Sequence, residues 1–204
     1  MVGYIGCGVR GIEAVRVIAG KYRGRPLRSL SGQDIRPTSD RLRETLFNVL
    51  TAGNPSSLEG TVWIDLFAGT GAVGIEALSR GAKEVMFVEN SARAAKLIEQ
   101  NLNSLEIKEG YKILRDDLAG VFWRLQRKHV AADVVFLDPP YRSGLAEPAL
   151  VALTEMGWLA PAALAVIELA AREAFSTPAG FAMIDERKYG AAKLIFLRRE
   201  GVAR

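Results

Sequence analysis

Val134-Val135-Phe136-Leu137-Asp138-Pro139-Pro140-Tyr141 is an apolar run that ends in a stiff polar corner. Its first four residues predict a buried strand. Two consecutive prolines can neither continue a β-ladder nor enter a helix interior, so the chain must stay extended just beyond the strand. Because ligands of open α/β sheets bind outside the carboxyl ends of strands, this corner is a candidate site.

The corner carries chemical groups that suit an aromatic amine. The Asp138 carboxylate and a neighbouring backbone carbonyl can accept the hydrogens of an exocyclic amino group, while the Tyr141 ring stacks on the base. The alternative interpretation is structural. In that case the prolines only end the strand, Asp138 is a cap and Tyr141 packs at the rim.

Strand and helix patterns alternate along most of the chain. An N-terminal hairpin is expected over residues 15–27 and a helix over 39–51. The alternation that follows predicts an α/β fold with a parallel sheet covered on both faces, closed by an antiparallel pair of strands near 182–187 and 192–198. The other predicted strands are 62–66, 84–88, 111–114, 133–137 and 163–169, and the other predicted helices are 72–80, 91–105, 118–126 and 145–156.

Length and composition limit the classes of function. A chain of 204 residues fits one domain, and 49% hydrophobic residues can form a full core. No apolar run reaches the roughly 18 residues that a membrane span needs. The single cysteine, Cys7, excludes an internal disulfide framework and favours a cytoplasmic protein. With His129 as the only histidine, neither a metal site nor a Cys–His nucleophile pair is expected.

Positive charge is concentrated near the N-terminus. The net charge is +4, but nine basic residues and only three acidic ones lie between Arg10 and Arg43. This asymmetry suggests a polyanionic partner, although a solvated face without a ligand is the alternative. The turn of the expected hairpin, residues 21–24, presents cations and a tyrosine, which suits phosphate contact and base stacking. The glycine-rich residues 1–14 are expected to be a disordered leader or the result of an upstream start.

A second candidate site follows the strand 62–66. The segment Asp65-Leu66-Phe67-Ala68-Gly69-Thr70-Gly71-Ala72-Val73-Gly74 lets the backbone turn tightly and approach a ligand. Its glycines match the spacing of dinucleotide sites, with Glu89 at the expected distance, so such a site is one interpretation and a packing turn is another. Asp65 suits a ligand ammonium group, however, and the Asp-Pro-Pro-Tyr corner has no obvious role in hydride transfer. Both features favour S-adenosylmethionine, with Glu89 on the ribose hydroxyls and Asp117, preferred over Asp116, on the adenine amine.

Four motifs occur in an order that resembles a known family. They are Val17-Ile18-Ala19-Gly20-Lys21-Tyr22-Arg23-Gly24-Arg25, Arg36-Pro37-Thr38-Ser39-Asp40-Arg41-Leu42-Arg43-Glu44-Thr45-Leu46-Phe47-Asn48, Asp65-Leu66-Phe67-Ala68-Gly69-Thr70-Gly71 and Asp138-Pro139-Pro140-Tyr141. Over about residues 15–199 the chain resembles the bacterial 16S ribosomal RNA guanine-N2 methyltransferases. Many methyltransferases share the glycine turn, and those that act on amino groups share the proline corner. The Arg-Pro-Thr helix joined to the basic hairpin is the more specific part.

The resemblance implies a Rossmann-like class I methyltransferase fold whose seven-stranded sheet has one antiparallel strand. It implies a leader (1–14), an RNA-contacting hairpin and helix (15–52) and a methyltransferase domain (53–204). The implied activity is transfer of a methyl group from S-adenosylmethionine to N2 of a guanine in 16S rRNA, free or in an assembling small subunit, without an obligate protein partner. The implied residues are Asp138, Pro139, Pro140 and Tyr141 at the target amine; Asp65, Phe67, Ala68, Gly69, Gly71, Glu89, Asn90, Asp117 and Thr38 at the cofactor; and Lys21, Tyr22, Arg23, Arg25 and Arg36 at the RNA.

Three other functions share parts of this pattern. An adenine-N6 DNA methyltransferase uses the same kind of proline corner. A dinucleotide-dependent oxidoreductase shares the glycine spacing, and a basic RNA-binding module without catalysis shares the hairpin.

Overall fold

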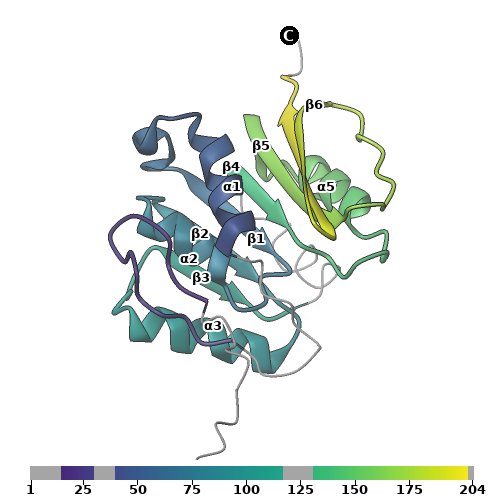
Figure 1. Cartoon of the computed structure of the whole chain (residues 1–204). Coiled ribbons are helices and arrows are strands. Elements are labelled where there is room, and N and C mark those ends of the chain that lie inside the picture. The colour runs from purple at the N-terminus through teal and green to yellow at the C-terminus, as the bar shows by residue number, and fades with distance from the viewer. Residues whose placement is uncertain (1–14, 30–39, 117–130, 202–204) are drawn as a thin grey trace, which may run out of the picture.

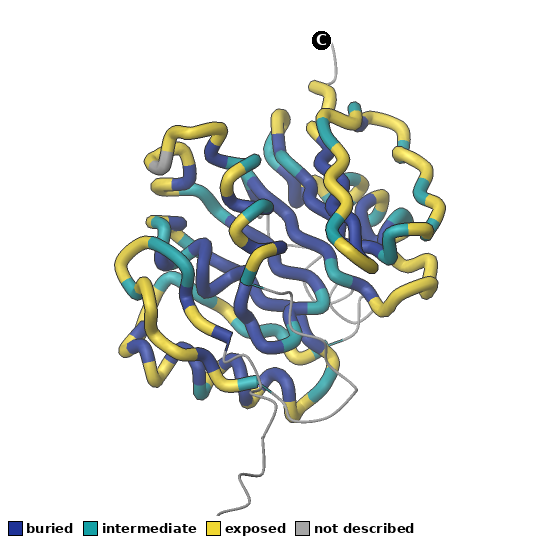
Figure 2. The backbone as a smooth tube through the Cα atoms, viewed as in Figure 1, coloured by how far each residue is buried: buried dark blue, intermediate teal, exposed yellow. Residues whose placement is uncertain are grey.

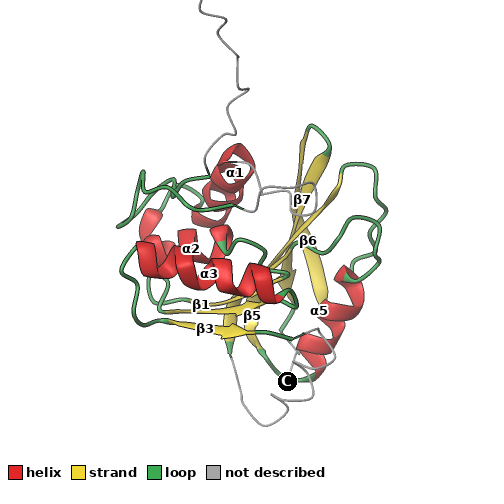
Figure 3. Ribbon diagram, turned by 90° about the horizontal axis from the view of Figure 1, so that it is seen from below, coloured by secondary structure: helices red, strands yellow, loops and turns green. Residues whose placement is uncertain are grey.

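The protein is built around one seven-stranded sheet with helices on both faces (Figures 1 and 3). The computed structural model describes residues 15–29, 40–116 and 131–201. The strand order is β3-β2-β1-β4-β5-β7-β6, and β7 is antiparallel to both of its neighbours. The other pairs are parallel. This topology confirms the expected class I methyltransferase fold, including its single antiparallel strand.

The elements agree closely with the predicted pattern in the alternating region. The helices end close to where the pattern breaks; for example, α2 ends at Ser79, two residues before Gly81. The bounds are α1 Asp40–Thr51, η1 Pro55–Leu58, β1 Val62–Leu66, α2 Ala72–Ser79, β2 Glu84–Val88, α3 Ala92–Ser104, β3 Tyr111–Leu114, β4 Ala132–Leu137, α5 Ala146–Glu155, β5 Leu159–Ala170, β6 Phe181–Tyr189 and β7 Ala192–Arg199. The helix expected over 118–126 lies outside the described residues. No described helix has both the length and the apolar character needed to cross a membrane.

Strand β5 begins four residues earlier than the apolar run 163–169 predicted. Its register with β4 shifts, because Ala132 pairs with Leu159 while Val134 pairs with Leu164. Pro161 lies in the extra length that this irregularity creates, where its missing N–H interrupts no regular ladder. Sequence periodicity alone does not reveal such a shift.

Alternation along the strands divides the core into two layers. Trp63, Phe87 and Phe136 belong to the cluster under α1, α2 and α3. Leu66 and Leu137 belong to the cluster under α5, on the other face. The central strands are therefore buried on both sides (Figure 2), as a parallel sheet between helices requires.

The N-terminal hairpin is docked against α2 by buried polar groups. Val17 and Arg25 pair across the hairpin, with the Val17 N–H donating to the Arg25 carbonyl at 3.0 Å. The Glu76 carboxylate, which is 0% exposed, accepts the backbone N–H groups of Ile18 and Ala19 at 2.7 and 2.9 Å. At the end of α2, Ser79 accepts the Lys21 N–H at its carbonyl, at 2.7 Å. The hairpin is thus held in a defined position beside α2 (Figure 1).

Candidate cofactor and substrate site

The glycine turn after β1 depends on several left-handed residues. Gly69 and Gly71 have φ of +54° and +75°, but Phe67 also has φ of +61°. A non-glycine residue pays about 1–2 kcal/mol for this conformation, and such strain is concentrated at functional sites. Beyond the turn, a Cβ on Gly74 would lie 2.3 Å from the Phe87 ring, so α2 packs directly on β2. The sequence indicated the need for glycine here but not the strained Phe67.

Asp65 lies beneath this turn rather than on its surface. Strand alternation directs it to the same face as Trp63, toward α2, and only 1% of it is exposed. Its Oδ2 accepts the backbone N–H of Gly74 at 3.0 Å. Burial raises the pKa of the Asp65 carboxyl to about 8; the Gly74 hydrogen bond opposes this shift and the nearby Glu89 charge adds to it. Asp65 therefore braces the first turn of α2, and its carboxyl is mostly neutral near pH 7 unless a cation nearby stabilises the charged form.

Glu89 closes the other side of the turn. It follows β2 and is 8% exposed. Its two carboxylate oxygens accept the backbone N–H groups of Gly69 and Ser91, each at 2.8 Å. A carboxylate has about four acceptor sites, so two remain for the hydroxyls of a ribose. The adjacent Asn90 is exposed, and Ser91 caps the N-terminus of α3.

The proline corner lies next to this turn. The backbone N–H of Asp138 donates to the carbonyl of Leu66 at 3.3 Å, so the ends of β4 and β1 are joined. Pro139 is buried and Pro140 is exposed. Tyr141 is 37% exposed, which leaves part of its ring accessible to a base. The two motifs predicted from the sequence are thus brought together at one edge of the sheet.

Two acids, one near the end of β5 and one just after it, support this corner, and neither was predicted from the sequence. Glu168 is 4% exposed and lies beside Asp138, because Leu137 and Ile167 are register partners one residue earlier. Its Oε1 lies 3.5 Å from the Tyr141 hydroxyl, which donates to it. Glu173 accepts the N–H of Arg142, whose φ of +60° follows the corner. The signal for Glu168 was an acid near the end of an otherwise apolar strand.

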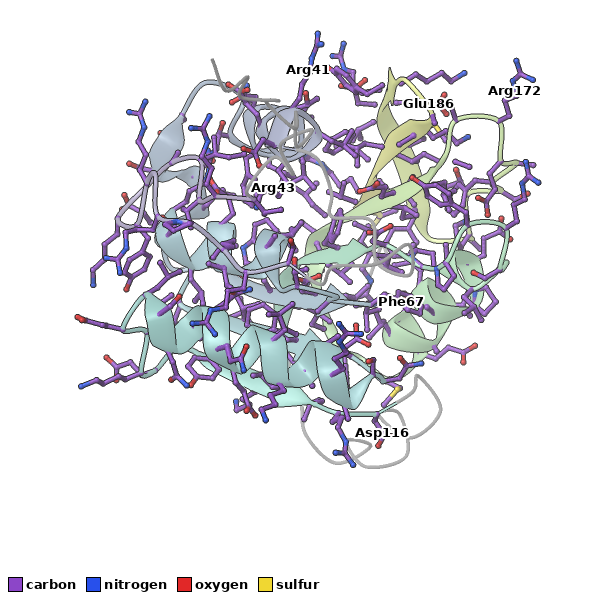
Figure 4. All side chains as sticks on the ribbon, turned by 60° about the horizontal axis from the view of Figure 1, so that its bottom comes forward. Arg41, Arg43, Phe67, Asp116, Arg172 and Glu186 are labelled. Carbon is purple, nitrogen blue, oxygen red and sulfur yellow. The ribbon has the colours of Figure 1, made fainter. Side chains whose placement is uncertain are left out.

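The edge therefore combines acids from neighbouring strands. The strand order places the ends of β3, β2, β1, β4 and β5 side by side. Asp116 follows β3 and adds a further acid to this edge of the sheet; Figure 4 labels it together with Phe67. Asp117 and Thr38, expected at the cofactor, and Arg36, expected at RNA, lie outside the described residues. No group of three or more His, Cys, Asp or Glu in the described part could hold a metal ion.

The basic residues near the N-terminus have different environments. Lys21 and Arg23 are exposed at the hairpin tip, whereas Tyr22 is half-buried and packs against the core. The guanidinium of Arg25 donates to the carbonyl of Ser104, at the end of α3, at 2.7 Å, so this side chain also has a structural role. Arg43 points into the protein and is 0% exposed, unlike Arg41, which projects outward from α1 (Figure 4). The basic surface is therefore smaller than the sequence count suggested.

The buried Arg43 joins α1 to the hairpin. Its Nη2 donates to the Arg16 carbonyl at 2.7 Å and to Asp40 Oδ1 at 2.6 Å. Burial lowers the pKa of the Arg43 guanidinium, and the charges of Asp40 and Glu76 oppose that shift. A single buried cation thus fixes two N-terminal elements to each other.

Comparison with known proteins agrees with this architecture. The family model "Conserved hypothetical protein 95" matches residues 15–198. The "Ribosomal RNA small subunit methyltransferase D" of Haemophilus influenzae is 38% identical over 176 residues, which cover 86% of this chain and 89% of that protein. The protein of the same name from Escherichia coli K12 is 36% identical over 191 residues, which cover 93% and 92%. The solved structure of the Escherichia coli protein yhhF superposes with a TM-score of 0.78 at 31% identity, covering 93% of this chain and 99% of that one. The chain therefore belongs to the Conserved hypothetical protein 95 family of ribosomal RNA methyltransferases, as the resemblance of its motifs predicted.

Proposed function

We propose that the protein transfers a methyl group from S-adenosylmethionine to the exocyclic N2 amine of a guanine in 16S rRNA, in the cytoplasm. Methylation of rRNA follows from the family, and the guanine amine as acceptor is the finer proposal. The observation that supports it most directly is the hydrogen bond from the Asp138 N–H to Leu66. This bond brings the Asp-Pro-Pro-Tyr corner beside the glycine turn, which supports its assignment to the target amine.

The acids of the sheet edge fit the cofactor's chemistry. S-adenosylmethionine offers an ammonium group, a ribose diol, an adenine amine and a sulfonium-bound methyl group, and carboxylates can accept or neutralise each of the first three. Asp65 is near enough to the turn to favour the ammonium group, and Glu89 retains acceptor sites for the ribose. We assign the adenine amine to Asp117, with Asp116 as the described neighbour, and further contacts to Thr38, Phe67, Ala68, Gly69, Gly71 and Asn90.

The corner can make the target amine reactive. The exocyclic nitrogen of guanine is a poor nucleophile because its lone pair is delocalised into the ring. When Asp138 and the Pro139 carbonyl accept its two hydrogens, a pyramidal nitrogen with its lone pair free is favoured. Tyr141 stacks on the base and Pro140 holds the corner rigid. Alignment of two reactants in this way can supply about 7–11 kcal/mol of the barrier reduction.

The hairpin and α1 form the proposed RNA-contacting part. Exposed Lys21 and Arg23 lie at the end of α2 opposite to the glycine turn, a separation of about 12 Å for an eight-residue helix. Because α2 itself is almost wholly buried, RNA that reaches both must cross the surface of the elements that cover this helix. Unstacking the target base costs a few kcal/mol, which phosphate contacts to the hairpin can offset. Arg25, Arg36 and Tyr22 are assigned to the same surface.

The decisive experiment separates chemistry from cofactor binding. Asp138→Ala is expected to abolish methylation of 16S rRNA while calorimetry still detects binding of S-adenosylhomocysteine. Glu155→Ala, which removes an exposed carboxylate from the end of α5 that is remote from the corner, serves as the control and should leave turnover unchanged. Near-normal turnover of the Asp138→Ala protein would refute the assignment.

The identity of the acceptor is tested by mass analysis of methylated nucleosides. Wild-type protein is incubated with 16S rRNA, with isolated small subunits and with DNA. N2-methylguanosine from either RNA substrate supports the proposal, whereas N6-methyladenine from DNA would replace it with the adenine alternative.

The RNA surface is tested by salt dependence. The double variant Lys21→Ala/Arg23→Ala removes two exposed cations, and for single-stranded RNA each phosphate contact contributes about 0.7 to the slope of log K against log salt. We expect the slope to fall by about 1.4. Arg198→Ala, an exposed cation on β7, is the matched control. An unchanged slope in the double variant would remove the hairpin from the RNA site.

A further inference from the structure

The hairpin exit and the glycine turn share one buried side chain, that of Asn101 on α3. Asn101 is 0% exposed. Its Oδ1 accepts the backbone N–H of Arg28 at 2.8 Å, and its Nδ2 donates to the Arg28 carbonyl at 3.1 Å. The same Nδ2 donates to the carbonyl of Thr70 at 3.0 Å. A carboxamide has two N–H donors and one carbonyl acceptor, so one side chain fixes both segments.

The two segments that Asn101 joins have different roles. Thr70 lies between Gly69 and Gly71, so its carbonyl belongs to the cofactor turn. Arg28 follows the hairpin, and its side chain is exposed although its backbone is held from both sides. The backbone of the hairpin tip is anchored by the Lys21 and Tyr22 N–H groups to Ser79, at the other end of α2. Arg28 is thus a basic residue whose backbone is connected through a single side chain to the turn.

We propose that Arg28 contacts an RNA phosphate between the hairpin tip and the cofactor turn, and that Asn101 is the positioning residue for both Arg28 and the turn. The inference rests on the proposed function in so far as the bound polyanion is RNA. Because the Arg28 backbone is already held, only its side chain has to be ordered when the guanidinium binds a phosphate. A turn whose carbonyl is already held likewise needs less ordering when the cofactor binds.

A purely structural role for Asn101 predicts a different result. In that case its loss lowers the free energy of unfolding, while the affinities of the folded protein for its ligands do not change. In the proposed role, the folded variant binds both ligands more weakly. Binding measured below the unfolding temperature therefore separates the two possibilities.

The experiment compares Arg28→Ala, Asn101→Ala and Ser104→Ala. Ser104 lies on the same helix, and its hydroxyl donates to the Asn101 carbonyl at 2.8 Å without touching the turn, so it is the matched control. Calorimetry gives the affinity for S-adenosylhomocysteine, and fluorescence anisotropy gives the affinity for a labelled 16S rRNA fragment. Thermal unfolding establishes that each variant is folded at the temperature used.

The expected pattern is specific to each variant. Asn101→Ala weakens both S-adenosylhomocysteine and RNA about three- to tenfold, the range expected for one net hydrogen bond. It also raises the KM for S-adenosylmethionine more than it lowers kcat. Arg28→Ala weakens RNA alone and lowers the salt slope by about 0.7. Ser104→Ala changes neither affinity.

Unchanged affinity for S-adenosylhomocysteine in folded Asn101→Ala would overturn the positioning role, and unchanged RNA affinity in Arg28→Ala would overturn the phosphate contact. If Asn101→Ala does not fold, Asn101→Ser carries the same expectation, because its shorter hydroxyl cannot reach both segments. Wild-type protein that binds no RNA would refute the proposed substrate. In that case the effect of Asn101 on S-adenosylhomocysteine binding is still measurable, so the two failures are distinguishable.

Discussion

Replacement of Gly20 by alanine tests whether the hairpin is docked on α2 as the structure describes. Gly20 has φ of +81°, and a Cβ there would lie 1.9 Å from the Ser79 carbonyl oxygen. The hairpin would have to move, which breaks the bond from the Lys21 N–H to that oxygen at 2.7 Å. It would also break the bonds of the Ser79 hydroxyl to the Tyr22 N–H at 3.0 Å and to the Ala19 carbonyl at 2.6 Å.

The expected loss of stability has two components. A left-handed alanine costs about 1–2 kcal/mol, and three lost hydrogen bonds cost about 0.5–1.5 kcal/mol each. Together they give about 3–6 kcal/mol, a large share of the 5–15 kcal/mol of a typical domain. Gly24→Ala is a close control, because Gly24 has φ of +80° in the same hairpin but nothing within 4 Å of its added Cβ. It should lose only the backbone component.

The assay is urea unfolding of wild type, Gly20→Ala and Gly24→Ala, followed by circular dichroism. The quantity of interest is the difference in free energy of unfolding between the two variants, which isolates the docking contacts from the cost of positive φ. We expect about 2–4 kcal/mol. Equal losses in the two variants would show that the hairpin does not depend on Ser79 and is not held in a fixed position on α2.

Two further predictions concern the site. The stabilising contribution of the neutral Asp65 carboxyl is complete below its unfolded pKa near 3.8 and is lost as the pH rises through about 8. Without cofactor, the free energy of unfolding gained by Asp65→Asn should therefore grow by about 1.4 kcal/mol per pH unit between pH 5 and 7. A difference in unfolding free energy that stays constant over this range would show that burial does not raise the pKa of Asp65. Glu168→Ala and Tyr141→Phe should each lower kcat by about threefold to tenfold, since each removes the hydrogen bond between the two side chains. The double variant should be no slower than the slower single one, and additive losses would show that Glu168 does not act through the Tyr141 hydroxyl.

Local chemistry made much of the fold predictable. Alternating strand and helix patterns located the described strands within a few residues, because apolar periodicity reflects which face each residue buries. The glycines and the double proline marked both ends of the candidate site, because those residues restrict or release the backbone wherever they occur. The same reasoning failed at the start of β5, where the register with β4 shifts at Ala132.

Burial and pairing across long sequence distances required the tertiary structure. Helical spacing places Arg43, unlike Arg41, on the same face as Leu46 and Phe47, but a charged residue there can also end in solvent; its full burial and its bond to the Arg16 carbonyl arise only when α1 packs beside the hairpin. The order of the strands brought Asp138 beside the glycine turn, and the fold placed Asn101 between Arg28 and Thr70. By itself the sequence determined the elements and the residue types available for chemistry. Which of them meet was decided by packing, since hydrogen bonds between residues 31 and 73 positions apart exist only in the assembled fold.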